Sequence, residues 1–135
     1  MGTTQPVYQP PLPCRPGSGI LPTHMTTHHQ IVLTTCPELT SARAIATAVV
    51  EQRLAACVNI VPGIESIYRW QGQLEHDNEL LLIIKTDSAS YAALERAIQA
   101  LHPAELPEII AVPLNAGLPA YLDWITASLK QINEE

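Results

Sequence analysis

The cysteines are the first residues of this 135-residue chain whose chemistry needs an explanation. Cys36 stands where a β-rich run ends and a helical pattern begins, and a thiol near a helix N-terminus can become a reactive thiolate. The simpler interpretation is a small buried residue, because free cysteine usually packs like an apolar side chain. Cys57 lies among small apolar residues, which favours packing more strongly, and Cys14 lies in a proline-rich tail.

His102 is the histidine best placed for a specific role, because it ends an expected helix immediately before Pro103. An imidazole there can cap the helix and meet the negative end of its dipole, or it can bind a metal ion. Glu105 and Glu108 follow closely and would add carboxylates. Three other histidines cluster before the first expected strand, where we expect solvated side chains: His24, His28 and His29.

Four side chains flank the longest expected hairpin and could line a cleft between subunits: Tyr68, Trp70, Glu79 and Lys85. Aromatic rings with one lysine suit a small anionic molecule, and crevices between subunits are common ligand sites. The alternative is a plain subunit interface, because apolar and aromatic stripes mostly serve packing. Both interpretations stay open at this point.

The sequence contains no catalytic signature. It has no glycine-rich phosphate loop, no HExxH, no GxSxG and no clustered pair of carboxylates at helical spacing on an expected helix. A cysteine enzyme would need a thiolate at Cys36 with a base beside it. We therefore predict a binding protein, not an enzyme, with no obligatory cofactor.

The composition excludes several classes of partner. The net charge is −6 and the few basic residues are scattered, which argues against nucleic acid. The longest apolar run has five residues, far short of the about 20 that cross a membrane. An odd number of cysteines without a CxxC pair predicts a reducing, cytoplasmic location.

The elements that would position these residues follow a clear order. Strands are expected at 30–35, 57–70 (bent at Pro62-Gly63), 74–86 and 109–114, and helices at about 41–55, 88–101 and from Pro119 onward. Caps are expected at Thr40 or Ser41 for the first helix and at Asp87 or Ser88 for the second. The order βαββαβ plus a C-terminal helix predicts an α+β, ferredoxin-like sandwich.

The chain divides into a tail and one domain. Residues 1–27 are rich in proline, lack acidic residues and have no apolar period, so we predict a disordered extension. Residues 28–135 form the expected domain. Met25 is a candidate second start of translation.

The expected hairpin around Gln71-Gly72 is too long for a small monomer. Apolar residues occur on both of its faces, which would leave an exposed edge liable to aggregate. A second copy of the chain that covers the hairpin would explain this pattern. The alternative is a hairpin that folds back on the helices of its own chain. We favour an oligomer.

The motifs strongly resemble the CutA family of divalent-cation-tolerance proteins. The similar stretches run from residue 30 to about 130 and include Arg53-Leu54-Ala55-Ala56-Cys57-Val58-Asn59, Ser66-Ile67-Tyr68-Arg69-Trp70-Gln71-Gly72, Glu79 with Leu80-Leu81-Leu82-Ile83-Ile84-Lys85-Thr86, His102-Pro103, Pro107-Glu108-Ile109-Ile110 and Tyr121-Leu122-Asp123-Trp124. The resemblance implies a ferredoxin-like homotrimer similar to the PII signalling proteins, a cytoplasmic location, and a link to copper and other divalent metals.

The resemblance also implies a copper site, which this sequence matches in part. The position of the family's first-strand cysteine is Thr34, and Cys36 follows two residues later on the same strand face. The first histidine position is Leu101, so His102 alone remains. The candidate ligands are therefore His102, Cys36 and Glu108, completed by a neighbouring subunit.

Two functions remain as hypotheses. The first is a trimer that binds copper or another divalent cation and contributes to the metal-ion response. The second is a PII-like signalling or scaffold trimer whose cleft between subunits binds a small anionic metabolite or a partner protein. Its lining would be Tyr68, Trp70, Lys85 and Glu108.

Overall fold

The computed structural model describes residues 27–130. The prediction of a disordered tail over residues 1–26 and the candidate start at Met25 lie outside the described residues. Thr27, the last residue of the predicted tail, is described, and its hydroxyl donates a hydrogen bond to the carbonyl oxygen of Leu114 at 2.6 Å. No helix within residues 27–130 is long and apolar enough to cross a membrane. The elements follow one another as β1 (His29–Cys36), α1 (Leu39–Glu51), β2 (Cys57–Trp70), β3 (Gln73–Asp87), α2 (Tyr91–Leu101), β4 (Ile110–Pro113) and α3 (Pro119–Leu129).

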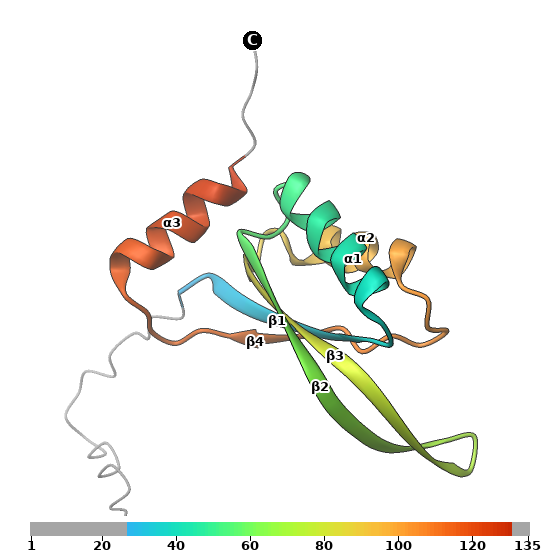
Figure 1. Ribbon diagram of the computed structural model, residues 1–135. Helices are drawn as coiled ribbons and strands as arrows, with labels where there is room; N and C mark the ends of the chain where they lie inside the picture. Colours follow the sequence, from blue (N-terminus) through green and yellow to red (C-terminus); the bar gives the residue numbers. More distant parts are fainter. Residues whose placement is uncertain (1–26, 131–135) are drawn as a thin grey trace, which may run out of the picture.

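The strands form one antiparallel sheet in the order β2-β3-β1-β4. Helices α1 and α2 lie together on one face of this sheet, and α3 lies at the end away from the hairpin tip (Figure 1). This arrangement confirms the predicted α+β, ferredoxin-like fold with a C-terminal helix. Pro119 is the first residue of α3, as predicted, because proline lacks the N–H that the first turn leaves unused.

The core lies between the sheet and helices α1 and α2. Alternate residues of the two central strands face the helices and are completely buried: Val32, Thr34 and Cys36 on β1, and Leu82, Ile84 and Thr86 on β3. They meet a second buried set on the helices, namely Ala42, Ile45, Val49, Leu94 and Ile98. The two-residue period of the strands therefore decides which residues are core and which lie on the opposite, open face of the sheet.

Strands β2 and β3 form the long hairpin that the sequence predicts, with Gln71 and Gly72 as its two-residue turn. Both turn residues have positive φ, 50° and 81°, as such hairpin turns require. A bulge interrupts the pairing between Val61 and Ile64, where Gly63 has φ of 83°. The bulge bends the hairpin, and its distal half extends beyond the sheet (Figure 1).

The ends of α1 and the start of α2 differ from the prediction. The expected caps of α1 are wrong: the helix begins at Leu39 after an extended Glu38, and the Ser41 hydroxyl donates to the Glu38 carbonyl oxygen at 3.0 Å. The expected end near residue 55 is also too late. Arg53 takes a left-handed conformation with φ of 59°, and the N–H of Leu54 then returns to the Val49 carbonyl oxygen at 2.9 Å.

Helix α2 begins at Tyr91, later than predicted, with Ser90 in the capping position. Asp87 still acts near the helix start, because its carboxylate accepts a hydrogen bond from the Ser90 N–H at 2.8 Å. β3 continues to Asp87, so the chain needs a turn before the helix can begin. This turn explains the delay.

Candidate functional site

The main pocket lies between the distal half of the hairpin, the end of β1 and the loop that follows α2. Its volume is about 810 Å³. The hairpin contributes Ser66, Ile67, Tyr68, Trp70, Asp77, Asn78 and Glu79; the end of β1 contributes Thr35 and Pro37; the loop contributes residues 102–108. Three segments far apart in the sequence thus meet at one concave surface.

Strand pairing explains why aromatic and acidic side chains face each other here. Ser66 lies opposite Asp77 and Tyr68 lies opposite Glu75, so even residues of β2 and odd residues of β3 share one face of the hairpin. The Tyr68 hydroxyl donates a hydrogen bond to the Asp77 carboxylate. That bond, with lesser contributions from desolvation and nearby acidic charges, raises the pKa of Tyr68 to about 12.

His102 is held at both ring nitrogens. Nε2 lies 2.6 Å from the carbonyl oxygen of Thr35, and Nδ1 lies 3.0 Å from the backbone nitrogen of Ala104. A carbonyl oxygen can only accept, so Nε2 carries the hydrogen; a backbone N–H can only donate, so Nδ1 is the acceptor. The imidazole is therefore neutral, in its Nε2–H tautomer, and both nitrogens have partners.

Cys36 lies directly behind this imidazole. Its side chain is completely buried and its Sγ atom is 4.0 Å from Nε2 of His102. Burial raises the pKa of the Cys36 thiol; a hydrogen bond with Ser41 opposes this effect, and the charge of Glu79 adds to it. Because the nearest imidazole nitrogen already carries a hydrogen, it is not placed to remove the thiol proton, and this pair lacks the geometry of a nucleophile with its base.

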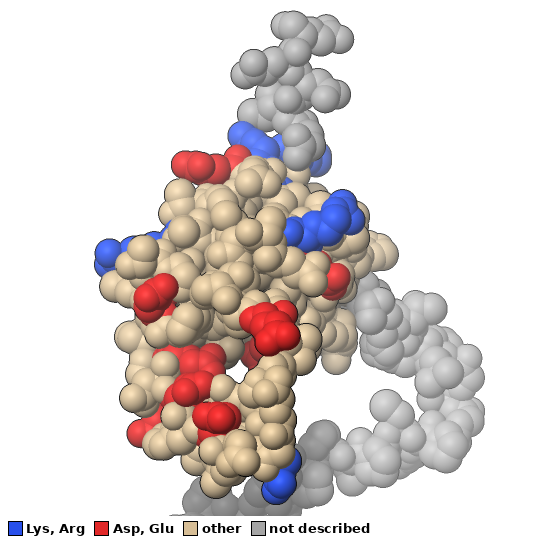
Figure 2. All heavy atoms as spheres, turned by 90° about the vertical axis from the view of Figure 1, so that its right-hand side faces the viewer, with Lys and Arg blue, Asp and Glu red and all other residues tan. Residues whose placement is uncertain are grey.

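The pocket has a negative electrostatic character. Its ionisable side chains are those of Tyr68, His102 and four acids, Asp77, Glu79, Glu105 and Glu108, and none of the described lining residues is Lys or Arg. In the view of Figure 2, acidic side chains gather around a hollow in the lower half of the molecule, and most basic side chains lie in the upper half. Such a surface attracts cations and repels anions.

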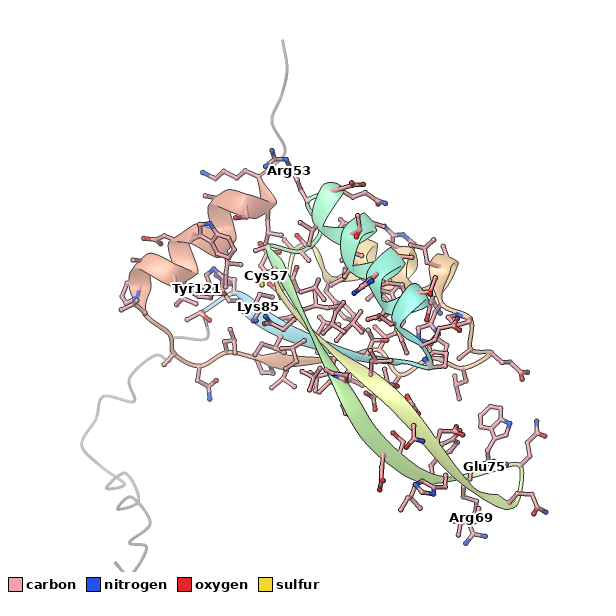
Figure 3. All side chains as sticks on the ribbon, in the orientation of Figure 1. Arg53, Cys57, Arg69, Glu75, Lys85 and Tyr121 are labelled. Atoms are coloured by element: carbon pink, nitrogen blue, oxygen red, sulfur yellow. The ribbon has the colours of Figure 1, made fainter. Side chains whose placement is uncertain are left out.

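The structure brings five of the seven predicted site residues to this pocket: Tyr68, Trp70, Glu79, His102 and Glu108. Cys36 is adjacent but buried. Lys85 is absent from the lining, because it is six residues from Glu79 along β3, or about 20 Å in a strand. It pairs with Cys57 at the other end of the sheet, near Tyr121 of α3 and far from the hairpin tip with Arg69 and Glu75 (Figure 3).

Sequence reasoning missed Asp77, which faces the pocket two residues before Glu79. The two-residue alternation of β3 was an available signal, since residues 75, 77 and 79 are all acidic. His29, expected to be solvated, is partly buried, and its Nε2 lies 2.8 Å from the Thr126 hydroxyl of α3. Within residues 27–130, no three His, Cys, Asp or Glu side chains lie close enough to hold a metal ion together.

The fold and the pocket define a class of protein, small ferredoxin-like α+β domains with a long β-hairpin over an acidic surface. The family model described as "CutA1 divalent ion tolerance protein" matches residues 30–128, which is most of the chain. The chain belongs to the CutA1 family. This confirms the resemblance of the spaced motifs.

Individual relatives agree with this assignment. The "Divalent-cation tolerance protein CutA" of Thermus thermophilus is 53% identical over 96 residues, covering 71% of this chain and 93% of the relative. A protein named "Protein CutA, chloroplastic" from Arabidopsis thaliana is 42% identical over 100 residues, covering 74% and 55%. The crystal structure of CutA from Xylella fastidiosa superposes with a TM-score of 0.76 at 44% identity, covering 77% of this chain and 100% of that one.

Proposed function

We propose that this protein binds a divalent cation, copper among them, in the acidic pocket, and that it contributes to the metal-ion response as a cytoplasmic homotrimer. The observation that carries the proposal is the charge of the pocket: four carboxylates and one imidazole line it, and no Lys or Arg stands among its described lining residues. Carboxylate groups are ligands for divalent metals, zinc among them. The role is binding, not catalysis.

The carboxylates fit a cation better than the expected Cys36–His102 pair does. A metal ligand must offer a free lone pair, and a thiol must first lose its proton. His102 has both ring nitrogens in hydrogen bonds, and burial keeps Cys36 protonated. We therefore assign Glu79 and Glu108 as the principal ligands.

One chain supplies an incomplete coordination shell, because no three potential ligands converge within residues 27–130. Water or a neighbouring subunit completes it. The trimer is supported by apolar side chains that a second copy would cover: Ile67 and Leu74 near the hairpin tip are 68% and 77% exposed, and Val61, Ile110 and Val112 are also exposed. Permanent oligomers bury such surfaces extensively.

The PII-like alternative, a small anionic ligand in this cleft, needs a positive group beside Tyr68 and Trp70. Lys85 was the candidate, and in the described chain it lies at the opposite end of β3. The pocket charge therefore favours a cation over an anionic metabolite. A cytoplasmic location agrees with two free cysteines, Cys36 and Cys57, within the described residues.

The test is calorimetric titration of the full chain with Zn²⁺ and, separately, Cu²⁺. We expect the double variant Glu79→Gln, Glu108→Gln to lower affinity by at least about tenfold, equal to about 1.4 kcal/mol. The matched control is Glu51→Gln, an exposed acid at the end of α1 outside the pocket. All variants keep the tail histidines, so any contribution from these residues cancels. Equal affinity in the double variant and the control would refute the proposal.

A further inference from the structure

The hydrogen bonds of His102 join three parts of the fold. The residue follows the last residue of α2, and its own backbone N–H donates to the Ile98 carbonyl oxygen at 2.9 Å. Through Nε2 its ring donates to the carbonyl of Thr35 near the end of β1, and through Nδ1 it accepts from Ala104 in the pocket loop. One side chain thus connects a helix end, a strand end and a loop.

The bond to Ala104 has the geometry of a local turn. A side-chain acceptor that binds the N–H two residues later is the arrangement of an Asx turn, in which Asn or Asp usually provides the acceptor. Here the Nδ1 atom of His102 is the acceptor, and Pro103 between the two residues restricts the backbone further. The direction in which the chain leaves α2 is therefore set by the imidazole.

The loop that starts at this turn carries two of the four pocket acids. Glu105 and Glu108 line the pocket, and β4 begins two residues after Glu108. The opposite wall, with Asp77 and Glu79, belongs to β3 and is fixed by strand pairing. The distance between the two acidic walls therefore depends on how the loop is anchored to the end of β1.

We infer that His102 is a positioning residue for the cation pocket and not a metal ligand: its neutral Nε2–H imidazole ties the loop of Glu105 and Glu108 to β1. This inference rests on the proposed function for its ligand, a divalent cation. The ring also covers Cys36, whose Sγ lies 4.0 Å from Nε2, so the thiol stays behind the pocket wall. Neither residue enters the coordination shell.

The first experiment is nitrogen NMR of the imidazole rings in the ¹⁵N-labelled full chain, before and after Zn²⁺. His102 is assigned with the His102→Asn variant. We expect a protonated Nε2 and an unprotonated, hydrogen-bonded Nδ1, with this pattern unchanged at saturating zinc. A zinc-induced shift of either ring nitrogen to the metal-bound position overturns the inference, as does an exchanging mixture of tautomers without zinc.

The second experiment separates anchoring from ligation with two substitutions. In His102→Asn the side-chain oxygen can still accept from Ala104 and keep the turn, but the donor to Thr35 is lost, whereas His102→Ala loses both hydrogen bonds. We therefore expect a graded loss: His102→Asn lowers zinc affinity by about threefold, and His102→Ala lowers it by about tenfold and speeds amide exchange at Ala104. Equal loss of zinc binding in both variants, with Ala104 still protected in His102→Asn, would overturn the inference.

The outcomes distinguish this inference from the proposed function. If the double variant Glu79→Gln, Glu108→Gln leaves zinc affinity unchanged, the proposed cation site is wrong. The tautomer of His102 and the exchange protection of the Ala104 amide still test whether His102 anchors the loop. If the carboxylate variants lose binding while zinc shifts the His102 ring nitrogens, the cation site stands and His102 is one of its ligands.

Discussion

Thr34 and Thr86 are both completely buried on the helix-facing side of the sheet, yet only one of their hydroxyls is satisfied. The Thr86 hydroxyl donates to the carbonyl oxygen of Leu54 at 2.7 Å. The Thr34 hydroxyl has no hydrogen-bond partner within residues 27–130. Two residues of the same type in the same layer therefore make opposite contributions to stability.

Thr86→Val should destabilise the protein. The substitution keeps the shape but leaves the Leu54 carbonyl without its donor, which costs about 1–3 kcal/mol. Urea unfolding at one fixed protein concentration measures the change, because an oligomer's stability depends on concentration. Thr86→Ser, which keeps the hydroxyl, is the control for the donor. An unchanged midpoint for Thr86→Val would show that this bond adds nothing.

Thr34→Val should stabilise the protein, by up to about 1 kcal/mol, because it removes a buried hydroxyl that lacks a partner. The same urea experiment applies. Thr34→Ser is the matched comparison, since it keeps the hydroxyl and loses only the methyl group, and it should destabilise. If Thr34→Val is the less stable of the two, the hydroxyl has a partner in solution.

The Tyr68 phenol should ionise at a pH near 12, because the Asp77 carboxylate accepts its proton in a hydrogen bond. Asp77→Asn should return the pKa towards the ordinary value of about 10. The folded-state pKa is raised, so any stability from this contact is present below about 10 and is lost as the pH rises through about 12. NMR titration of the tyrosine rings measures both values. A Tyr68 pKa that is the same in both proteins would contradict the contact.

Gly72→Ala should destabilise the hairpin only because alanine disfavours the backbone conformation at this position. Gly72 has φ of 81°, and a Cβ built there meets no atom within 4 Å, so only the left-handed conformation is costly, by about 1–2 kcal/mol. Gln71→Asn is the matched control at φ of 50°, and should be neutral or slightly stabilising because Asn tolerates this region. Thermal unfolding compares the stabilities of the two variants. A smaller loss of stability for Gly72→Ala than for Gln71→Asn would contradict the left-handed conformation of Gly72 in the turn.

Cys36 should resist alkylation while Cys57 reacts. Cys57 is partly exposed, whereas Cys36 is fully buried and burial raises its thiol pKa. If the opening that exposes Cys36 costs about 3 kcal/mol, its reaction is slower by about a hundredfold. Peptide mapping after iodoacetamide, in a Cys14→Ser variant, follows both thiols. Comparable rates would show that Cys36 is accessible in the native state.

Much of the architecture follows from local patterns. The two-residue period of β1 and β3, the turn at Gln71-Gly72 and the proline at the start of α3 predicted their elements to within a few residues, because each depends on neighbours in the chain. The caps of α1 were wrong for a physical reason. The sequence offers Thr40 and Ser41, but the helix begins at Leu39 after the extended Glu38, whose carbonyl oxygen accepts from the Ala42 N–H and from the Ser41 hydroxyl.

Local sequence patterns do not predict how the residues of the site are arranged. The sequence by itself determined the fold class, the family, the acidic excess and the identity of five pocket residues, since residue types and the two-residue period of the strands can be read directly from the chain. Only the tertiary structure decided that Lys85 lies at the far end of β3, that Asp77 faces Tyr68, and that both nitrogens of His102 are occupied by Thr35 and Ala104. Those facts depend on distances between segments, which register, bulge and loop direction set together.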